Sequence, residues 1–400
     1  MIPIYAAHWQ TPPAPTFQSV PVVPLALYVH WPWCVRKCPY CDFNSHELIC
    51  QNEPQEAAYF AALIADLEAA LPVVWGRSIV SVFIGGGTPS LMSGETVDAL
   101  LAAIRMRLPL LPDAEITLEA NPGTVEAARI SAYRAAGVNR LSLGIQSFDD
   151  AKLAALGRIH SGDEARRAID IAQQYFERVN LDLMYALPQQ TLDEAQCDID
   201  TAIATGVGHI SAYHLTLEPN TAFHHAPPPL PDDDLAADMQ DMVEAQLAAA
   251  GFAHYETSAF ARSGQRCQHN LNYWQFGDYL GIGAGAHSKL SDNSLHGGIR
   301  REARPRHPKD YLADPATRDW QPVALHDLPG EFMMNALRLT DGVSQTLFAE
   351  RTGLPLSTIE KSVLAGRQAG LLDAANGRLR PTEQGQRFLN RLLALFLADA

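Results

Sequence analysis

From residue 25 onward, short runs rich in strand-favouring residues alternate with longer stretches in which apolar residues recur at helical spacing. The runs predicted as strands are residues 25–31, 79–84, 115–119, 140–146, 179–185 and 209–217. The stretches predicted as helices are residues 55–71, 97–108, 124–136, 163–176 and 192–205. Strands that alternate with helices at this spacing predict repeated βα units and a parallel sheet. Six such units favour an α/β fold of the partial (β/α)6 barrel type, although a flat doubly wound sheet has the same periodicity.

The character of the chain changes at three places, which divides it into four segments. Residues 1–24 are rich in proline and predict an extended leader. Residues 25–230 hold the predicted barrel, and the run PPPLPDDD at 227–234 opens a linker and accessory segment, 231–318. Residues 319–400 form the last segment, and we expect it to fold as a separate small domain.

That last segment has a recognisable order of elements. Helical patterns cover residues 331–339, 345–351, 357–369 and 383–397. Between the last two, apolar runs around Leu371 and Leu379 flank Asn376-Gly377, a dipeptide that favours a type I′ hairpin. Three helices, a hairpin and a closing helix predict a winged-helix-like α+β domain.

Charge and hydropathy narrow the classes of partner. The formal net charge is −15 and the pI is about 5.3. An acidic surface repels phosphate backbones, so we do not expect nucleic acid as a partner. No apolar run approaches the roughly 20 residues of a transmembrane helix, and residues 1–24 lack the pattern of a signal peptide. The sequence therefore predicts a cytoplasmic protein without a transmembrane segment.

Three of the six cysteines, Cys34, Cys38 and Cys41, fall on one short loop after the first predicted strand. Clustered thiols in a cytosolic chain indicate metal rather than disulfides. Three thiolates on one loop can hold three irons of a [4Fe-4S] cluster and leave the fourth iron open for an external ligand. The alternative is a zinc site completed by His46 or Cys50.

The cysteine spacing, with Tyr40 just before the last cysteine, resembles the motif of the radical S-adenosylmethionine (SAM) superfamily. The flanking residues Tyr28-Val-His and Cys38-Pro-Tyr-Cys-Asp-Phe-Asn-Ser-His are similar to the branch that contains oxygen-independent coproporphyrinogen III oxidase and radical SAM haem chaperones. The resemblance implies a radical SAM barrel, a [4Fe-4S] cluster on the three cysteines and SAM bound at the open iron.

Polar residues at strand ends form the candidate SAM site. In barrel folds, residues at the C-terminal ends of parallel strands bind ligands, and a triple glycine at 85–87 can present backbone N–H groups to a carboxylate. By resemblance, Tyr28, Gly86 and Glu119 contact the SAM that chelates the cluster. The residues that match positions contacting a second SAM, or extending the pocket, are Tyr40, Gly87, Thr88, Gln146, Arg158 and Asp182.

Two features favour the haem chaperones within this branch. Phe43 stands where the oxidase has a further cysteine, and the run His269-Asn270-Leu-Asn-Tyr273-Trp274 is similar to a signature of the haem chaperones. Imidazole ligates haem iron and aromatic rings cover the porphyrin face. We predict His269 as the axial ligand, with Asn270, Tyr273 and Trp274 in the haem pocket. Cys267 is the rival ligand, and a purely structural role for this run is the remaining alternative.

The resemblance implies that the chain binds haem as cargo and transfers it to an unidentified acceptor protein. The alternative functions are the anaerobic decarboxylation of coproporphyrinogen III and the chemistry of another radical SAM enzyme. Fold alone does not decide among them, because one scaffold hosts many reactions.

Overall fold

The computed structural model describes residues 23–48, 53–292, 298–374 and 377–397. Its centre is a 12-stranded sheet with the order β14-β13-β12-β11-β1-β4-β5-β6-β7-β8-β10-β9. The six predicted strands are found as β1 (Leu25–Trp31), β4 (Ile79–Gly86), β5 (Leu110–Ala120), β6 (Arg140–Gln146), β7 (Val179–Tyr185) and β8 (His209–His214). Each pairs in parallel with the next. This confirms the prediction of a partial barrel.

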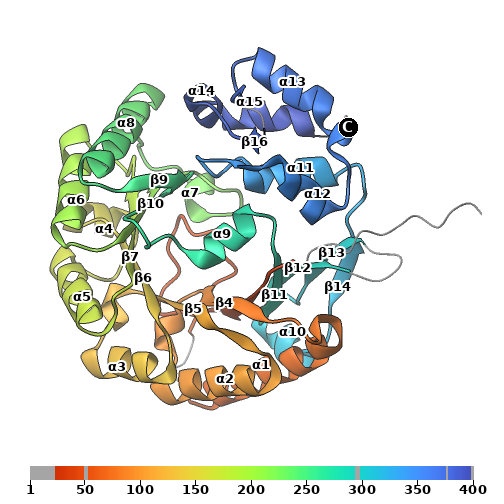
Figure 1. Ribbon diagram of the computed structural model, residues 1–400. Coiled ribbons are helices and arrows are strands. Elements are labelled where there is room, and N and C mark those ends of the chain that lie inside the picture. Colours follow the sequence, from red (N-terminus) through yellow and green to blue (C-terminus); the bar gives the residue numbers. More distant parts are fainter. Residues whose placement is uncertain (1–22, 49–52, 293–297, 375–376, 398–400) are drawn as a thin grey trace, which may run out of the picture.

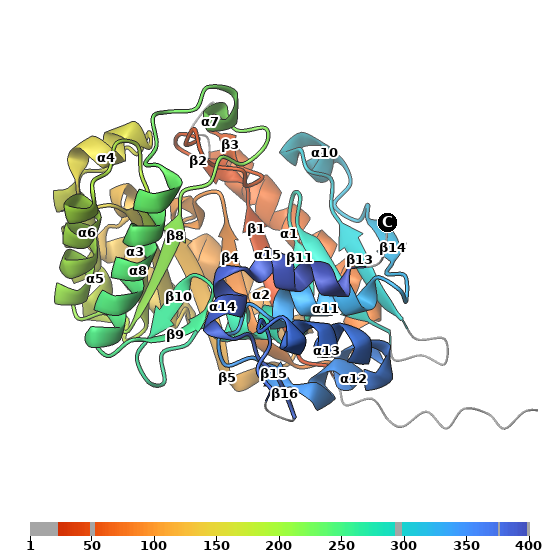
Figure 2. The same cartoon turned by 90° about the horizontal axis from the view of Figure 1, so that it is seen from above.

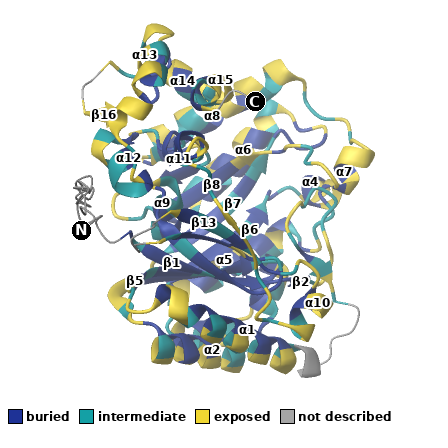
Figure 3. Cartoon of the chain, turned by 90° about the vertical axis from the view of Figure 1, so that its right-hand side faces the viewer, coloured by how far each residue is buried: buried dark blue, intermediate teal, exposed yellow. Residues whose placement is uncertain are grey.

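Helices cover the outer face of this curved sheet, as Figure 1 shows. They are α1 (Glu53–Val74), α2 (Gly94–Arg107), α3 (Ala127–Ala136), α5 (Gly162–Tyr175) and α6 (Leu192–Ala204). Local sequence sets where they begin, because Ser161 and Thr191 each form a capping box with the glutamate three residues later. Their apolar side chains and the strands form one continuous core. Figure 3 shows that the helix faces turned away from the sheet are exposed.

The sheet extends past both ends of the predicted barrel. Next to β1 lies β11 (Asp278–Ile282), which is also parallel, followed by the antiparallel strands β12 (His287–Ser291), β13 (Ile299–Ala303) and β14 (Asp319–Pro322). At the other end, β10 (Ala259–Ala261) and β9 (Ala253–Glu256) add antiparallel strands to β8. The described residues of the accessory segment therefore contain five strands, β9 to β13, and three helices, α8 (Asp233–Ala249), α9 (Gln268–Trp274) and α10 (Pro308–Ala313). None of these strands is longer than five residues, so they give a weak periodic signal.

The C-terminal segment packs a second core around Phe332, Phe348 and Leu392. Its elements are α11 (Leu328–Ala336), β15 (Val343–Ser344), α12 (Gln345–Thr352), α13 (Glu360–Gln368), β16 (Arg378–Leu379), α14 (Glu383–Arg387) and α15 (Leu389–Leu393). Figure 2 shows these helices beside the strands that extend the barrel. Helix α11 contacts α9 (Gln268–Trp274), which carries the predicted haem signature.

One helix of this segment differs from the prediction, and the predicted hairpin pairs with a further strand. The closing helix expected over 383–397 is broken at Phe388, whose backbone is not helical (φ −111°, ψ 42°). The predicted hairpin forms, with Leu372 bridged to Pro381, and β16 pairs in addition with β15. Asn376 lies outside the described residues, while Gly377 has the left-handed φ of +89° that such turns require.

By length and composition alone, helix α1 could span a membrane, with a mean hydropathy of 1.7 over Glu56–Val74. Within the fold, however, Tyr59, Leu63 and Leu67 lie fully in the core. Asp66, also fully buried, forms ion pairs with arginines of the accessory strands. A core helix of a globular domain shows the same composition, so this helix is weak support for a membrane span.

Candidate functional site

The loop that carries the three predicted cluster cysteines is closed by a short pair of strands. Directly after β1, strand β2 (Trp33–Cys34) pairs with β3 (His46–Glu47). Inside the loop, the Cys41 N–H donates to the carbonyl of Cys38 at 3.1 Å. The Lys37 ammonium donates to two loop carbonyls at 3.1 and 3.2 Å. The chain thus fixes the loop before any metal binds, and it leaves all three thiols half-buried and free.

The surroundings of the thiols are partly apolar. Burial raises the pKa of Cys34 and of Cys41 above the ordinary thiol value. The Ser45 hydroxyl lies 3.7 Å from the Cys41 sulfur, and the Arg158 guanidinium donates to the Cys38 sulfur at 3.6 Å. Cys34 and Cys41 must therefore release their protons when they bind metal as thiolates.

The spacing of the sulfurs separates a cluster from a single zinc ion. Among the described residues, only Glu115, Cys267 and His269 bring three donor atoms within 4.8 Å of one another. At least one pair of the loop sulfurs therefore lies further apart than that, whereas thiolates on one tetrahedral zinc are each only about 2.3 Å from the metal. His46 contacts the ring of His307, and Cys50 lies outside the described residues. The loop fits a cluster of several irons.

One cavity of about 380 Å³ brings the three cysteines together with the predicted SAM residues. It lies at the C-terminal ends of the parallel strands, as expected for a barrel. The predicted residues that line it are Tyr40, Gly86, Gly87, Thr88, Glu119, Gln146, Arg158 and Asp182. Tyr28 does not line it. Its hydroxyl is hydrogen-bonded to the His30 ring at 2.8 Å, and it lines two neighbouring cavities. We call the 380 Å³ space the cluster cavity.

The glycine loop does not offer the free amides that the sequence suggested. The Gly87 and Thr88 N–H groups donate to the carbonyls of Trp31 and Trp33 at 2.6 and 2.8 Å. The Gly86 N–H donates to the Glu119 carboxylate at 3.1 Å. A Cβ at Gly86 would lie 2.5 Å from the His30 ring, and one at Gly87 would lie 2.6 Å from the Trp33 carbonyl. These glycines let the backbone approach β1 and β2 closely, because a side chain at either position would collide with them. The prediction that their N–H groups are free to bind a carboxylate is therefore wrong.

Two acidic residues, Glu119 and Asp182, lie half-buried in the wall of the cluster cavity. Burial and the nearby Asp182 raise the pKa of Glu119 to about 8. Burial likewise raises the pKa of Asp182, which accepts hydrogen bonds from Ser142 and Asn180. Neither carboxyl forms an ion pair with any residue in the described part of the chain. Acids of this kind suit a cationic ligand, and SAM carries both an ammonium and a sulfonium group.

A larger cavity of about 730 Å³ adjoins the cluster cavity, and the two share Phe43, Gly86 and Glu119. Its aromatic lining comprises Tyr28, Phe83, Tyr273, Trp274, Phe276, Tyr279 and the rim residue Phe43. Polar side chains reach it from the accessory strands and the loop that follows them, namely His287, Lys289, Arg301 and Arg306. We call this space the aromatic cavity. Of the predicted haem residues, it contains Tyr273 and Trp274.

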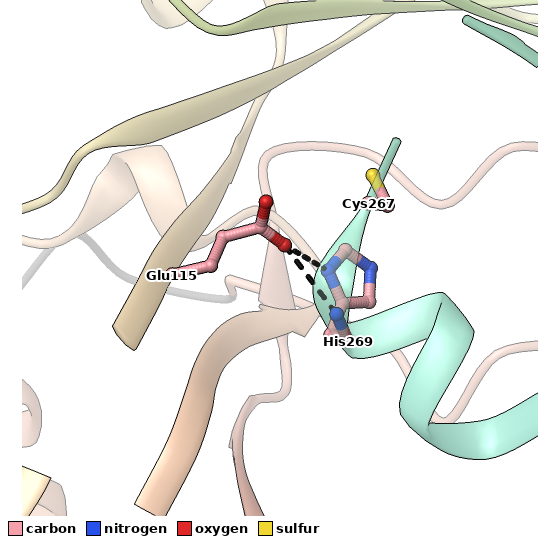
Figure 4. A group of neighbouring side chains, drawn as sticks. All are labelled: Glu115, Cys267 and His269. Atoms are coloured by element: carbon pink, nitrogen blue, oxygen red, sulfur yellow. Dashed lines mark hydrogen bonds and ion pairs between the residues drawn. The ribbon is translucent and has the colours of Figure 1, made fainter. Parts of the chain in front are cut away.

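The other two predicted haem residues lie deeper. His269 and Asn270 line a smaller cavity of about 210 Å³, together with Tyr273. His269 stacks on Phe83 with ring centres 4.2 Å apart, and its Nδ1 is hydrogen-bonded to Glu115 at 3.2 Å (Figure 4). Burial lowers the pKa of His269, so its imidazole is neutral at pH 7.

The cluster of Glu115, Cys267 and His269 in Figure 4 has the donor types of a metal site, yet its chemistry is that of a structural anchor. Glu115 is ion-paired with Arg140 and Arg178 at 3.4 and 3.3 Å and accepts the Gln268 N–H. Although burial alone opposes it, the His269 hydrogen bond and the two arginines hold the pKa of Glu115 below its usual value.

Cys267, the rival haem ligand, lies in the same buried group. Burial raises its pKa to about 12, so the thiol stays protonated at neutral pH. Together, these contacts tie the start of α9 to β5. Sequence reasoning missed Glu115 as a partner of this segment, because the two positions are far apart in the chain.

Comparisons with known proteins agree with this geometry. Residues 28–201 match the radical SAM superfamily model and residues 323–388 match the HemN C-terminal domain model. The solved structure of coproporphyrinogen III oxidase (HemN) from Escherichia coli superposes with a TM-score of 0.77, covering 95% of this chain and 91% of that one. At 21% identity, this likeness shows the fold.

Curated relatives match over nearly their full lengths. "Heme chaperone HemW" of Escherichia coli K12 is 48% identical over 95% of this chain and 100% of its own, and that of Haemophilus influenzae is 46% identical over 94% and 98%. The mitochondrial "Radical S-adenosyl methionine domain-containing protein 1" of Bos taurus is 37% identical over 96% of this chain and 89% of its own. The chain therefore belongs to the HemW family of the radical SAM superfamily.

Proposed function

We propose that this protein is a haem chaperone, which binds haem and transfers it to an acceptor protein on a scaffold that also binds a [4Fe-4S] cluster and SAM. The names of the HemW relatives support haem as the cargo. The observation that carries the proposal is the aromatic cavity of about 730 Å³ beside the cluster cavity. A cavity of that size with aromatic walls suits a flat apolar ligand.

In this proposal, Cys34, Cys38 and Cys41 hold the cluster. When bound, the cluster supplies an iron with an open position for SAM. The chain can support the cluster through three thiols on a loop that hydrogen bonds hold in place. It can support SAM through two half-buried acids, which form no ion pair with any described residue. Glu119 accepts from the SAM ammonium, and Asp182 and Gln146 accept from its ribose hydroxyls.

Arg158 has a narrower role than the sequence suggested. Two of its guanidinium nitrogens donate to the Cys38 sulfur and to the Gly144 carbonyl, while Nε is buried without a partner in the described part of the chain. It therefore places a positive charge next to the cluster loop and keeps one donor for a ligand carboxylate. Tyr40, Gly87 and Thr88 complete the cavity wall.

The competing function is the anaerobic decarboxylation of coproporphyrinogen III. Phe43 argues against it. Where the oxidase has a cysteine, this chain has an aromatic side chain that is 62% exposed and lines both cavities. A benzyl group adds apolar contact area and offers neither a proton nor a sulfur ligand. A position of this kind suits the binding of a macrocycle better than its conversion.

The test is anaerobic reconstitution of the full chain, followed by parallel haem titration and a coproporphyrinogen III turnover assay. We expect stoichiometric haem binding and no protoporphyrinogen IX. Repeated turnover of coproporphyrinogen III would establish the enzyme instead. An absence of haem binding would remove the chaperone function.

Further parts of the proposal follow from the sequence. His269, the predicted axial ligand, has a neutral imidazole, which is able to bind iron. However, its Nδ1 is already hydrogen-bonded to Glu115, and its ring lines the cavity of about 210 Å³ rather than the aromatic cavity. Tyr273 and Trp274 are proposed as wall residues. Three statements stay predictions: the protein is cytoplasmic, the haem acceptor is a protein, and nucleic acid is not a partner.

A further inference from the structure

The aromatic cavity gathers positive charge in a chain whose formal net charge is −15. Lys289 is buried and paired with Asp278 at 3.0 Å, and Arg301 pairs with Glu331 at 2.6 Å, so both are compensated. Arg306 is exposed at the cavity wall and forms no ion pair or side-chain hydrogen bond with another described residue. Its guanidinium is therefore the cation of this cavity that is free to bind an anion.

The acids of the cavity do not oppose an anionic ligand. Glu119 is the acidic residue in the described lining, and burial with the nearby Asp182 raises its pKa to about 8. Without SAM it is mostly protonated at pH 7, and with SAM its charge is balanced by the SAM ammonium, so in both cases it contributes little net negative charge. A ligand with carboxylates consequently meets a neutral inner wall and a cationic outer wall.

Two imidazoles line the aromatic cavity, and only one of them is available to a ligand. His30 is buried with Nδ1 bonded to the Tyr28 hydroxyl at 2.8 Å and Nε2 to the Asn44 carbonyl at 3.0 Å. His287, the first residue of β12, is exposed and its ring makes no hydrogen bond with any residue that the structure describes. Partial burial and the neighbouring Arg301 and Arg306 lower the pKa of His287, which keeps the ring neutral.

We propose that haem binds in the aromatic cavity, with its iron ligated by His287 and a propionate bound by Arg306. The inference rests on the proposed haem-chaperone function and adds the location of the cargo. The porphyrin lies against the aromatic wall that includes Tyr273 and Trp274. His269 then acts as a positioning residue, because its bond to Glu115 holds α9 and with it this wall.

A single exposed ligand also suits transfer. With His287 on one face, the iron keeps an open position on the other, to which a residue of an acceptor can bind before the first bond breaks. The iron–nitrogen bond is simply exchanged, so no electron or further reactant is needed. Bound ferric haem is therefore expected to be five-coordinate.

The test is a haem titration of the reconstituted full chain, read as a difference spectrum and by EPR of the ferric haem. His287→Ala is expected to lose the axial-nitrogen signature, and free imidazole is expected to restore it. His269→Gln, which keeps a hydrogen-bonding side chain toward Glu115, is expected to retain the signature. His326→Ala is the matched control, since His326 is exposed but does not line the cavity.

Arg306 is tested with a ligand variant. Arg306→Ala is expected to weaken haem binding about tenfold, since a hydrogen bond to a charged group contributes on that order. Haem dimethyl ester, which lacks the carboxylates, is expected to bind the unaltered chain about as weakly and to lose nothing further in Arg306→Ala. Lys309→Ala, an exposed cation outside the cavity, is the control.

The outcomes separate this inference from the function on which it rests. Normal haem binding with an unchanged signature in His287→Ala, or loss of the signature only in His269→Gln, overturns the assigned site and leaves the chaperone function standing. Unchanged affinity in Arg306→Ala overturns the propionate contact. A chain that binds no haem at all overturns the proposed function and the inference with it.

Discussion

The cluster cavity and the aromatic cavity are neighbours with opposite chemistry. The cluster cavity is lined by strand ends and holds thiols and half-buried acids; of its two arginines, Arg158 is bonded to a sulfur and a carbonyl, and Arg36 is exposed. The aromatic cavity is lined by rings and has a free guanidinium at its rim. The cluster cavity suits a cationic ligand such as SAM, held close to a metal cluster. The aromatic cavity suits a flat, anionic ligand such as haem, which must be released again. One barrel end thus separates a resident cofactor from a cargo.

The most decisive test of this separation is Cys38→Ala. We expect complete loss of the broad cluster absorbance near 400 nm and of SAM binding, because the cluster loses a ligand. Haem affinity should change by no more than about twofold, because Cys38 does not line the aromatic cavity. Cys197→Ala, an exposed cysteine on α6, is the control, and Cys50→Ala should also keep the cluster. A matching fall in haem affinity would show that the cavities act as one site.

The anchor that ties α9 to β5 is tested by Glu115→Gln. Removing one partner of a buried charge pair destabilises a protein by about 3 kcal/mol, because Arg140 then lacks a counter-charge. Urea unfolding measures the loss, and haem affinity should fall with it as α9 loosens. Asp113→Asn, exposed on the same strand, provides the comparison. Equal stability of the two variants would show that Glu115 is not an anchor.

A pH series distinguishes the cluster cavity from the aromatic cavity. Because the pKa of Glu119 is raised to about 8, a cation bound beside it lowers that pKa and releases a proton. SAM affinity should therefore rise up to about tenfold per pH unit below pH 8. Without SAM, the sign for folding is the reverse: this carboxyl stabilises the fold at low pH, and the contribution is lost as the pH rises through about 8.

Calorimetry in buffers of different ionisation enthalpy measures the released proton. Glu119→Gln should abolish both the release and the pH dependence of SAM binding. If the same slope persists in Glu119→Gln, another group accepts the cation.

The smallest effect concerns Phe43, which both cavities share. Phe43→Ala should weaken haem binding about fivefold, the equivalent of roughly 1 kcal/mol of lost apolar burial. SAM-induced changes in the cluster EPR spectrum should remain. Phe388→Ala removes a similarly exposed phenylalanine from the C-terminal segment and should change neither. An equal loss of SAM binding would place Phe43 with the cluster cavity.

The cluster cavity could be predicted because its residues stand in short motifs at strand ends, where a parallel barrel brings them together. The aromatic cavity could not, since β1, α9, β12, β13 and α11 meet there from distant parts of the chain. Nothing local shows that β11 pairs with β1. The failed amide nest has a similar cause: whether the Gly87 N–H is free depends on the carbonyl of Trp31, on another strand.

The pairing of β11 with β1 has a consequence for the order of synthesis. Cys34, Cys38 and Cys41 leave the ribosome early, while the strand that covers the outer edge of β1 follows only after the whole barrel has been made. Until then β1 is an open edge strand, next to which another backbone could pair. The metal loop is thus complete in sequence long before the cargo cavity has walls. In the proposed function, the chain thus makes its cluster ligands before it makes the walls that would hold haem.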